Sequence, residues 1–518
     1  MKLNLSVFLI TSLFFIGAIA CTTYFGKRRT KNALDLTVGG RNIGGLFIAL
    51  SYGASLVSTS AIVGFGGVAG LYGYSLYWGI LGNMLIGTFI AFYVYGRRVR
   101  VIGERFGAES FPQLMGKRFE SKFLQKSIGV IIYVFLPAYT SIILIGGANF
   151  VAGATGIDYK LALIIISVLV LLYVSYGGLI GVIYTDALLA SIMFLSSVIL
   201  LGTILWKVGG ITTAHNVLDS ITHLIPNNLV QAGHNGWVWM PDLGSTIWWT
   251  VMSTLVLGIS VGTLAQPHLQ VKFMAVKSEK NIYIGIVAAA IFIWFLTGGY
   301  VLVGIFSNVY FYNKTGQISL FAAEGNVDMI IPMTISSLMP EWFVYLFMFG
   351  LLAAALSSSA SLLHLQGVAF ARDIFDNFNT EKNTKRMMQL GIVIGLSFGL
   401  LLAFVLPAGI IARATVFWFG ICAICWLPSY TGCLFWKGSS KAGAIASVYG
   451  GLVFALFWYG FVKASEAVPL GICMALTGKP VLFGHPWSSM DPMVIGVPLS
   501  ALIFIVVSIF TKKPDNNL

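Results

Sequence analysis

Long apolar stretches recur along the chain and are separated by short polar segments. A helix that crosses the hydrocarbon core of a bilayer needs about 20 mostly apolar residues, and thirteen stretches come close to that length. The predicted spans are residues 4–24, 44–70, 74–96, 127–152, 159–176, 181–206, 246–266, 282–306, 342–370, 387–406, 408–430, 441–463 and 493–511. The pattern therefore predicts an all-α polytopic membrane protein.

The positions of the basic residues give this protein an orientation. Most of the 31 Lys and Arg residues fall in alternate loops, and Lys272, Lys277 and Lys280 lie together in one of these loops. Cytoplasmic loops of membrane proteins are enriched in Lys and Arg, so we expect a cell-membrane protein with its N-terminus outside and its C-terminus in the cytoplasm. The opposite loops contain only Lys2, Lys160, Lys207, Lys314, Lys463 and Lys479.

Composition excludes several classes of function. Charged residues make up 9% of the 518 positions and apolar residues 58%, whereas about 25% of an ordinary soluble protein is charged. The basic loops account for the net charge of +13, so it does not indicate a nucleic-acid partner. The six histidines are scattered and form no catalytic constellation. We therefore expect no enzyme activity, no nucleic-acid binding and no obligate protein partner.

Two spans contain small residues in a pattern that a simple anchor would not need. The second span includes the run from Ala49 to Ser60, and the seventh contains Gly258 and Gly262 and ends at Gln266-Pro267. Non-helical backbone at membrane depth is tolerated where it lines a polar cavity, and matching broken helices in two halves indicate a transporter's binding site. The alternative is close helix packing through small residues.

These irregular spans divide the chain into parts. We expect an extra N-terminal transmembrane helix in residues 1–26, followed by a first five-helix repeat in 40–210 and a second in 244–432. Two C-terminal transmembrane helices and a short cytoplasmic tail would occupy residues 433–518.

The ninth span carries four serines between Ser357 and Ser361. A desolvated monovalent cation prefers hydroxyl and carbonyl oxygens. Span nine could supply the hydroxyls and an unwound span two the carbonyls. The alternative is that these serines bond to carbonyls of their own helix.

Asp186 and Arg413 are the charged residues that this assignment places well within spans. Ionisable groups inside a membrane are costly and are functional candidates by default. For Arg413, about five residues into its span, the alternative is that the side chain reaches back to the outer interface.

Several segments together resemble the sodium/solute symporters, relatives of the bacterial proline, pantothenate and sugar carriers. The matching segments are Gly39-Gly-Arg-Asn-Ile-Gly-Gly45, Tyr176-Gly-Gly-Leu-Ile-Gly-Val-Ile-Tyr-Thr-Asp186, Gln266-Pro-His-Leu-Gln-Val-Lys-Phe-Met-Ala275, Ala353 to Ser361, and Arg372-Asp-Ile-Phe375. The resemblance implies a leucine-transporter-like fold, in which two inverted repeats of five helices follow one added helix.

The resemblance also implies ion sites. In this family a sodium ion lies between the unwound part of span two and span nine. The matching groups here would be the backbone carbonyls of Ala54, Val57 and Ala354 and the hydroxyls of Ser357 and Ser358. Some members hold a second sodium through residues that would be Asp186 and Ser361, although this chain has Ala360 where such members have a neighbouring serine.

For the solute, the family resemblance gives less guidance. Sugar carriers have Asn and Gln at the span-two positions that correspond here to Leu56 and Ala61, and proline carriers have an Asp where this chain has Leu56. A guanidinium offers a planar fork for a carboxylate, so Arg413 favours a small carboxylate-bearing solute such as a monocarboxylate, an amino acid or a pantothenate-like acid. The candidate substrate contacts are Ser55, Ser58, Trp248, Trp249, Arg413 and Phe417.

We therefore expect a sodium-coupled symporter that works by alternating access. Two alternatives remain open. A proton-coupled carrier of the same fold would use Asp186 as its titrating group, and a membrane solute sensor would bind its solute without transporting it.

Overall fold

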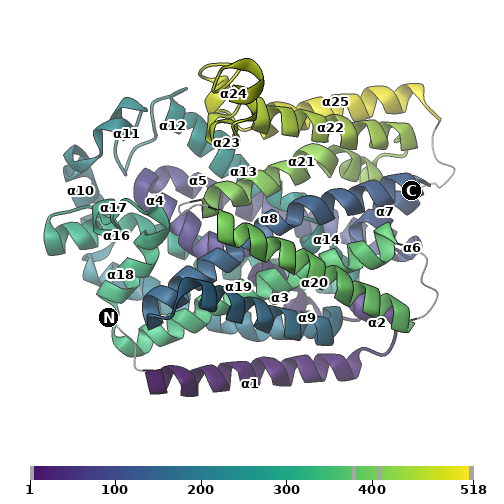
Figure 1. The fold of residues 1–518 in the computed structure, drawn as a ribbon, viewed down its shortest axis with the longest axis horizontal. Coiled ribbons are helices and arrows are strands. Elements are labelled where there is room, and N and C mark those ends of the chain that lie inside the picture. The colour runs from purple at the N-terminus through teal and green to yellow at the C-terminus, as the bar shows by residue number, and fades with distance from the viewer. Residues whose placement is uncertain (1–4, 376–380, 407–409, 513–518) are drawn as a thin grey trace.

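Long helices that run along one axis dominate the computed structural model, which describes residues 5–375, 381–406 and 410–512 (Figure 1). Within these residues, eleven helices are long and apolar enough to cross a membrane. The longer α-helices are α1 (Leu5–Arg29), α8 (Lys122–Thr155), α9 (Tyr159–Lys207), α15 (Glu279–Ile293), α16 (Gly299–Thr315), α19 (Glu341–Val368), α20 (Glu381–Val405), α21 (Ile411–Phe435), α22 (Lys441–Phe461) and α25 (Met493–Phe510).

The difference between eleven helices and thirteen predicted spans comes from two places where the chain turns without a long loop. The first is α9, whose 49 residues include Gly178 at φ 56° and ψ −170°. A straight helix of that length would measure about 73 Å, more than twice the hydrocarbon thickness of a bilayer. Gly178 therefore divides α9 into the two predicted spans 159–176 and 181–206.

The second place is Gly73, which ends α4 (Gly66–Tyr72) with φ 64° and ψ −147°. The apolar segment Ser60–Arg105 is continuous and contains the end of the predicted span 44–70 and the whole of the span 74–96. Gly73 separates these two parts. The remaining spans correspond to single segments. The predicted starts at residues 4 and 408 lie outside the described residues.

Shorter elements gather at the two ends of the bundle (Figure 1). At one end lie α10 (Gly210–Ser220), α11 (Asn227–Gln231), α12 (Thr246–Trp249), α23 (Ala464–Leu470) and α24 (Ile472–Thr477). At the other end lie α2 (Ala33–Val38), α6 (Arg97–Arg105) and α7 (Phe111–Arg118). Helix α1 starts at the first end and α25 finishes at the second, as an odd number of crossings requires.

Other short α-helices complete the bundle, and several stretches wind as wider π-helices. The short helices are α3 (Gly45–Leu56), α5 (Tyr77–Gly82), α13 (Leu257–Leu264), α14 (Pro267–Met274), α17 (Ser319–Ala322) and α18 (Ile330–Leu338). The π-helical stretches are η2 (Ser60–Phe65), η4 (Asn83–Gly96), η6 (Thr250–Val256), η7 (Trp294–Gly298) and η9 (Ala369–Ile374). Such turns are rare and often accompany functional sites.

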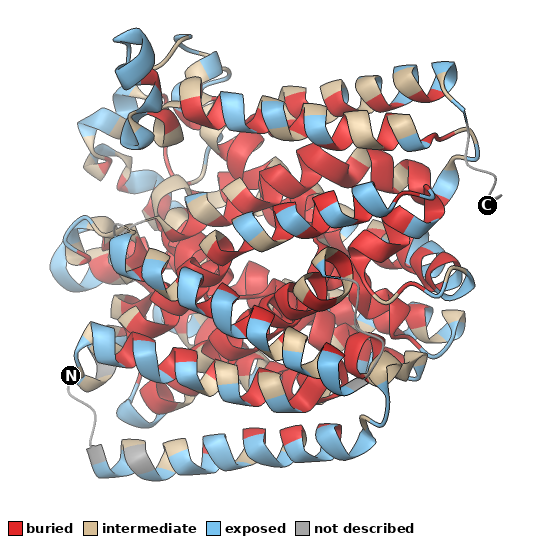
Figure 2. Cartoon of the chain, turned by 45° about the vertical axis from the view of Figure 1, so that its right-hand side comes forward, coloured by how far each residue is buried: buried red, intermediate tan, exposed pale blue. Residues whose placement is uncertain are grey.

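Helix α19 lies at the centre of the bundle (Figure 1), and most residues there are buried (Figure 2). Every residue from Ala353 to Val368 is buried, so its serine run faces protein on all sides instead of lipid. Helix α1 lies at the edge against α9. There Gly26 approaches Gly181 so closely that a Cβ atom on Gly26 would lie 2.3 Å from the Gly181 Cα.

Candidate functional site

The second predicted span is broken in the middle of the bundle. Helix α3 ends at Leu56, and Val57 leaves helical geometry with φ −87° and ψ 80°. The Ser58 amide donates to the Leu56 carbonyl, and the Ala61 amide donates to that of Ser58. In an unbroken helix these two amides would bond to the carbonyls of Ala54 and Val57. The break therefore releases both carbonyl oxygens from the helical ladder.

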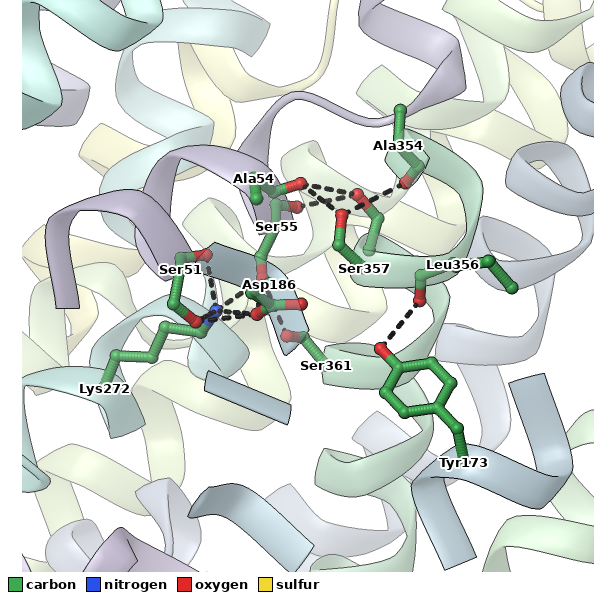
Figure 3. Close-up of polar contacts among 11 residues, drawn as sticks. Ser51, Ala54, Ser55, Tyr173, Asp186, Lys272, Ala354, Leu356, Ser357 and Ser361 are labelled. Carbon is green, nitrogen blue, oxygen red and sulfur yellow. Dashed lines mark hydrogen bonds and ion pairs between the residues drawn. The ribbon is translucent and has the colours of Figure 1, made fainter. Parts of the chain in front are cut away.

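Helix α19 presents two hydroxyls to this break (Figure 3). Ser357 Oγ donates to the Ala54 carbonyl at 2.9 Å and lies 3.4 Å from the Ala354 carbonyl. Ser358 Oγ lies 3.2 Å from the carbonyls of Ala54 and Ser55. The structure thus brings four of the five predicted sodium ligands into one buried cluster of neutral oxygens, with the fifth, Val57, at the break beside them. Carbonyl and hydroxyl oxygens are the groups that replace the hydration shell of a monovalent cation.

A second polar cluster lies one turn away and contains a charge that the sequence analysis did not place here. Lys272 is buried, and its ammonium nitrogen lies 3.1 Å from Asp186 Oδ2. The same nitrogen donates to the Ser51 carbonyl at 2.6 Å, to Ser51 Oγ at 2.7 Å and to Ser55 Oγ (Figure 3). The assignment of Lys272 to a cytoplasmic loop was therefore wrong.

The reason is the course of the seventh span. The predicted span stops at residue 266, but α14 continues into the bundle from Pro267 to Met274 and buries Lys272. Asp186 and Arg413 are consequently not the only charges inside the bundle. A buried charge is tolerated when it is paired and hydrogen-bonded, and Asp186 provides that partner.

Ser55 joins the two clusters. Its carbonyl accepts from Ser358, while its hydroxyl lies 2.7 Å from the hydroxyl of Ser361 and 3.3 Å from Asp186 Oδ2. Ser361 and Asp186, the predicted second sodium ligands, therefore do lie near each other. The ammonium of Lys272 shares Asp186 with them.

The seventh span is broken as well. Helix α13 ends at Leu264, and Gln266 is extended at φ −75° and ψ 113° before α14 begins. Two indole groups of α21 stabilise this break. Trp426 Nε1 donates to the Ala265 carbonyl at 2.8 Å, and Trp418 Nε1 donates to Gln266 Oε1 at 2.7 Å. The break predicted in the second span is thus present. In the seventh span, Gly258 and Gly262 lie within helix α13, and the break falls at Gln266, where the span was expected to end. The tryptophans that hold this second break were missed.

A small cavity lies beside the break that follows Leu56. Its polar groups are all neutral, and apolar and aromatic side chains supply the rest of its wall. The lining residues are Leu56, Ser60, Ala61, Phe65, Asn83, Tyr139, Ile259, Thr297, Thr415 and Phe419. Small-molecule sites typically combine such apolar walls with a few polar groups.

The predicted substrate contacts lie elsewhere. Arg413 is exposed in the first turn of α21, which begins at Ile411, so its position is not deep in a span as expected. A guanidinium at a helix end keeps its contact with water. Trp248 and Trp249 are partly buried in α12 and pack edge to face at 4.8 Å. None of these three side chains lines the cavity.

The other three candidates are also outside its wall. Phe417 packs on Tyr459, with ring centroids 4.5 Å apart. Ser55 faces Asp186 and Ser361. Ser58 bonds to Ser60, 2.5 Å away, and only Ser60 of this pair lines the cavity. Composition and spacing show how polar a span is, but they do not show which neighbour each side chain faces.

Two broken helices, an oxygen cluster suited to a monovalent cation and an adjoining cavity inside a helical bundle define a membrane carrier. A profile of the family described as "Sodium:solute symporter family" matches residues 37–451, and the chain belongs to this family. Membership makes the protein a multi-pass transporter, makes sodium its coupling ion, and confirms the resemblance seen in the sequence.

The similar proteins point the same way. A protein named sodium/proline symporter from Staphylococcus aureus strain JH9 is 26% identical, and the match covers 99% of this chain and 94% of the relative. A Na+-coupled sialic acid symporter, solved in a substrate-bound outward-open state, superposes with a TM-score of 0.75 at 18% identity and 99% coverage of both chains.

A nucleobase-cation-symport-1 family transporter, solved closed with bromovinylhydantoin bound, gives a TM-score of 0.54 at 12% identity. This match covers 92% of the chain and 95% of the transporter. These similarities confirm the predicted leucine-transporter-like fold.

Proposed function

We propose that this protein is a secondary active symporter of the cell membrane that imports a small carboxylate-bearing solute together with sodium. The observation that carries the proposal is the meeting of the broken helix α3 with Ser357 and Ser358 of α19. It joins elements of the two proposed repeats, residues 40–210 and 244–432, through oxygens that can bind a cation.

The proposed sodium ligands are the carbonyls of Ala54, Val57 and Ala354 and the hydroxyls of Ser357 and Ser358. In the structure these hydroxyls donate to carbonyls. A bound ion would turn the lone pairs of the same hydroxyls toward itself and hold α3 against α19. Sodium would then favour one arrangement of the repeats, which is how an ion couples to a conformational change.

We place the solute at the small cavity beside the break that follows Leu56, in contact with Ser60, Asn83, Tyr139 and Thr415. The break gives the second half of the span a helix N-terminus at Ser60 and Ala61, which line the cavity. Helix N-termini stabilise anionic groups, so this feature replaces Arg413 as the support for a carboxylate. The similarity to a sodium/proline symporter makes L-proline the first probe.

The energy available from one ion is sufficient for uptake. A sodium ion that moves through about −100 mV releases ~2.3 kcal/mol. A tenfold concentration gradient adds ~1.4 kcal/mol. Together they support accumulation of roughly several hundredfold.

The first experiment is thermal unfolding of the purified protein in sodium and in potassium, with L-proline, other amino acids, monocarboxylates and sugars as probes. A ligand that binds the native state raises the melting temperature. We expect a carboxylate to raise it in sodium and not in potassium. Stabilisation that is indifferent to sodium would contradict the proposal, and uptake into liposomes driven by a pH gradient without sodium would identify a proton-coupled carrier.

The basic loops support an orientation with the end of the bundle that holds α2, α6 and α7 in the cytoplasm. Lys117→Cys and Lys479→Cys, on opposite ends, test this in whole cells when the five native cysteines are replaced by alanine. We expect a membrane-impermeant thiol reagent to label the Lys479→Cys variant and not the Lys117→Cys variant.

A further inference from the structure

The ammonium group of Lys272 sits in a set of oxygen atoms resembling an ion site. Its contacts are the Ser51 carbonyl, the hydroxyls of Ser51 and Ser55, and Asp186 Oδ2. We call these four oxygens the Lys272 cage. All four come from buried residues, and Lys272 reaches them from α14, while Ser51 and Ser55 belong to α3 and Asp186 to α9.

With Lys272 in place, the charges of the Lys272 cage balance. One ammonium faces one carboxylate, and Ser51 Oγ also donates to Asp186 Oδ2 at 2.6 Å. A free cation could enter only by displacing the ammonium or by lying directly beside it, where like charges repel in a medium of low dielectric constant. Removing only the lysine would leave a buried carboxylate with no counter-ion, which is strongly unfavourable.

The cage also touches the proposed sodium site. Ser55 offers its hydroxyl to Lys272 and its carbonyl to Ser358 (Figure 3). The fixed ammonium therefore helps to position the backbone beside the sodium ligands without occupying their site.

We propose that Lys272 is a built-in cation that fills a second cation position, so that the protein binds a single sodium ion. The inference rests on the proposed function, because it presupposes sodium at Ser357 and Ser358. It assigns a role to a buried charge that sodium binding and solute binding do not otherwise require.

Equilibrium binding of radioactive sodium to the purified protein tests the inference without knowledge of the solute. We expect the parent protein to bind one sodium ion per chain. Lys272→Met should bind two, since sodium enters the cage to neutralise Asp186. Lys272→Met/Asp186→Asn should return to one, because the cage then has no charge to neutralise. Lys277→Met, which removes an exposed lysine from the loop after α14, should keep the value of the parent.

The outcomes separate the two proposals. A parent that binds two ions, or a folded Lys272→Met that still binds one, would overturn the built-in cation and leave sodium coupling intact. A parent without saturable sodium binding would overturn the proposed function and the inference with it. If Lys272→Met can be purified in sodium but not in potassium, sodium has replaced the ammonium, which supports the inference. If it folds in neither salt, the parent's stoichiometry decides, with one ion in support and two against.

Discussion

Ser357 Oγ and the Ala54 carbonyl oxygen lie 2.9 Å apart although 303 residues separate them in the chain. The contact joins α19 to the broken end of α3. Both residues are fully buried, and they belong to different proposed repeats. A movement of one repeat relative to the other would therefore change this distance.

Replacing Ser358 with alanine tests the sodium site. The substitution removes a hydroxyl that reaches the carbonyls of Ala54 and Ser55. A hydrogen-bonding group that acts on a charge contributes about 1.5–3 kcal/mol, so the sodium concentration for half-maximal stabilisation should rise at least about tenfold. Thermal unfolding over a sodium titration at constant ionic strength measures it.

Ser359→Ala is the matched control. Ser359 is the next residue of α19, and its buried hydroxyl has no hydrogen-bond partner among the described residues. Its loss should leave the sodium titration of the parent unchanged. Equal sodium affinity in Ser358→Ala and Ser359→Ala would remove Ser358 from the site.

Gly178→Ala tests the turn inside α9. Its φ of 56° and ψ of −170° lie close to a region that is essentially restricted to glycine and costs other residues about 1–3 kcal/mol. A Cβ atom would also lie 3.0 Å from Leu36 Cδ1. We expect a lower melting temperature. In the control Gly202→Ala, on the same helix, the added Cβ has no atom within 4 Å, so the melting temperature should stay level or rise. The same result in both variants would argue against strain at Gly178.

Trp426→Phe tests the support of the second break. The substitution leaves the Ala265 carbonyl without the indole that now donates to it at 2.8 Å. An unsatisfied buried carbonyl costs about 1–3 kcal/mol, so the melting temperature and the sodium-dependent activity should both fall. Trp206→Phe, at a tryptophan that is 75% exposed, should change neither. If Trp426→Phe left the melting temperature and the activity unchanged, the indole would not be needed to stabilise the break.

His234 gives the protein a pH-dependent stability. Burial lowers the pKa of His234 below its ordinary value of 6.5, although its bond to the Leu71 carbonyl opposes this. The ring is held neutral, since Nε2 donates to Leu71 at 2.7 Å while Nδ1 accepts from the Gly236 amide at 3.0 Å. The unfolded chain therefore takes up a proton first as the pH falls below 6.5, and native stability decreases until the pH reaches the lowered pKa.

Melting temperatures at about pH 7.5 and about pH 5.5 measure this effect. We expect the drop between them to be smaller in His234→Gln than in the parent. His215→Gln, which replaces an exposed histidine of α10, should keep the full drop. An undiminished drop in His234→Gln would assign the pH dependence to other groups.

The spans could be predicted because they depend on length and average hydropathy, which are local properties. The break at Val57 could also be predicted, since small residues mark positions where a helix is weak. At Gln266 the same reasoning predicted the end of a span, and the structure has a break within it instead. The turn inside α9 at Gly178 falls between the predicted spans 159–176 and 181–206. It could be predicted because an apolar stretch that is long enough for two crossings must reverse its direction in between.

The site itself depends on contacts that sequence distance hides. Lys272 and Asp186 are 86 residues apart, and one lysine near a span end has the same local pattern whether it faces water or a carboxylate. The position of Arg413 shows the opposite case. The sequence predicted it well inside a span, but α21 begins at Ile411, so Arg413 lies in the first turn of the helix and is exposed. Along α21, Trp418 contacts Gln266 at the second break whereas its neighbour Phe417 packs on Tyr459, and the sequence does not show which helix face meets which neighbour.

The pairing of Lys272 with Asp186 also affects how the membrane voltage acts on the transport cycle. A bare carboxylate at this depth would carry a negative charge through the field each time the empty protein returned to accept new cargo. Because Lys272 is part of the chain and stays beside Asp186, this pair is neutral when the empty protein returns to its starting conformation. With the proposed single sodium ion, the membrane potential would act on the cycle through that ion alone, and this site would move no net charge through the field during the return.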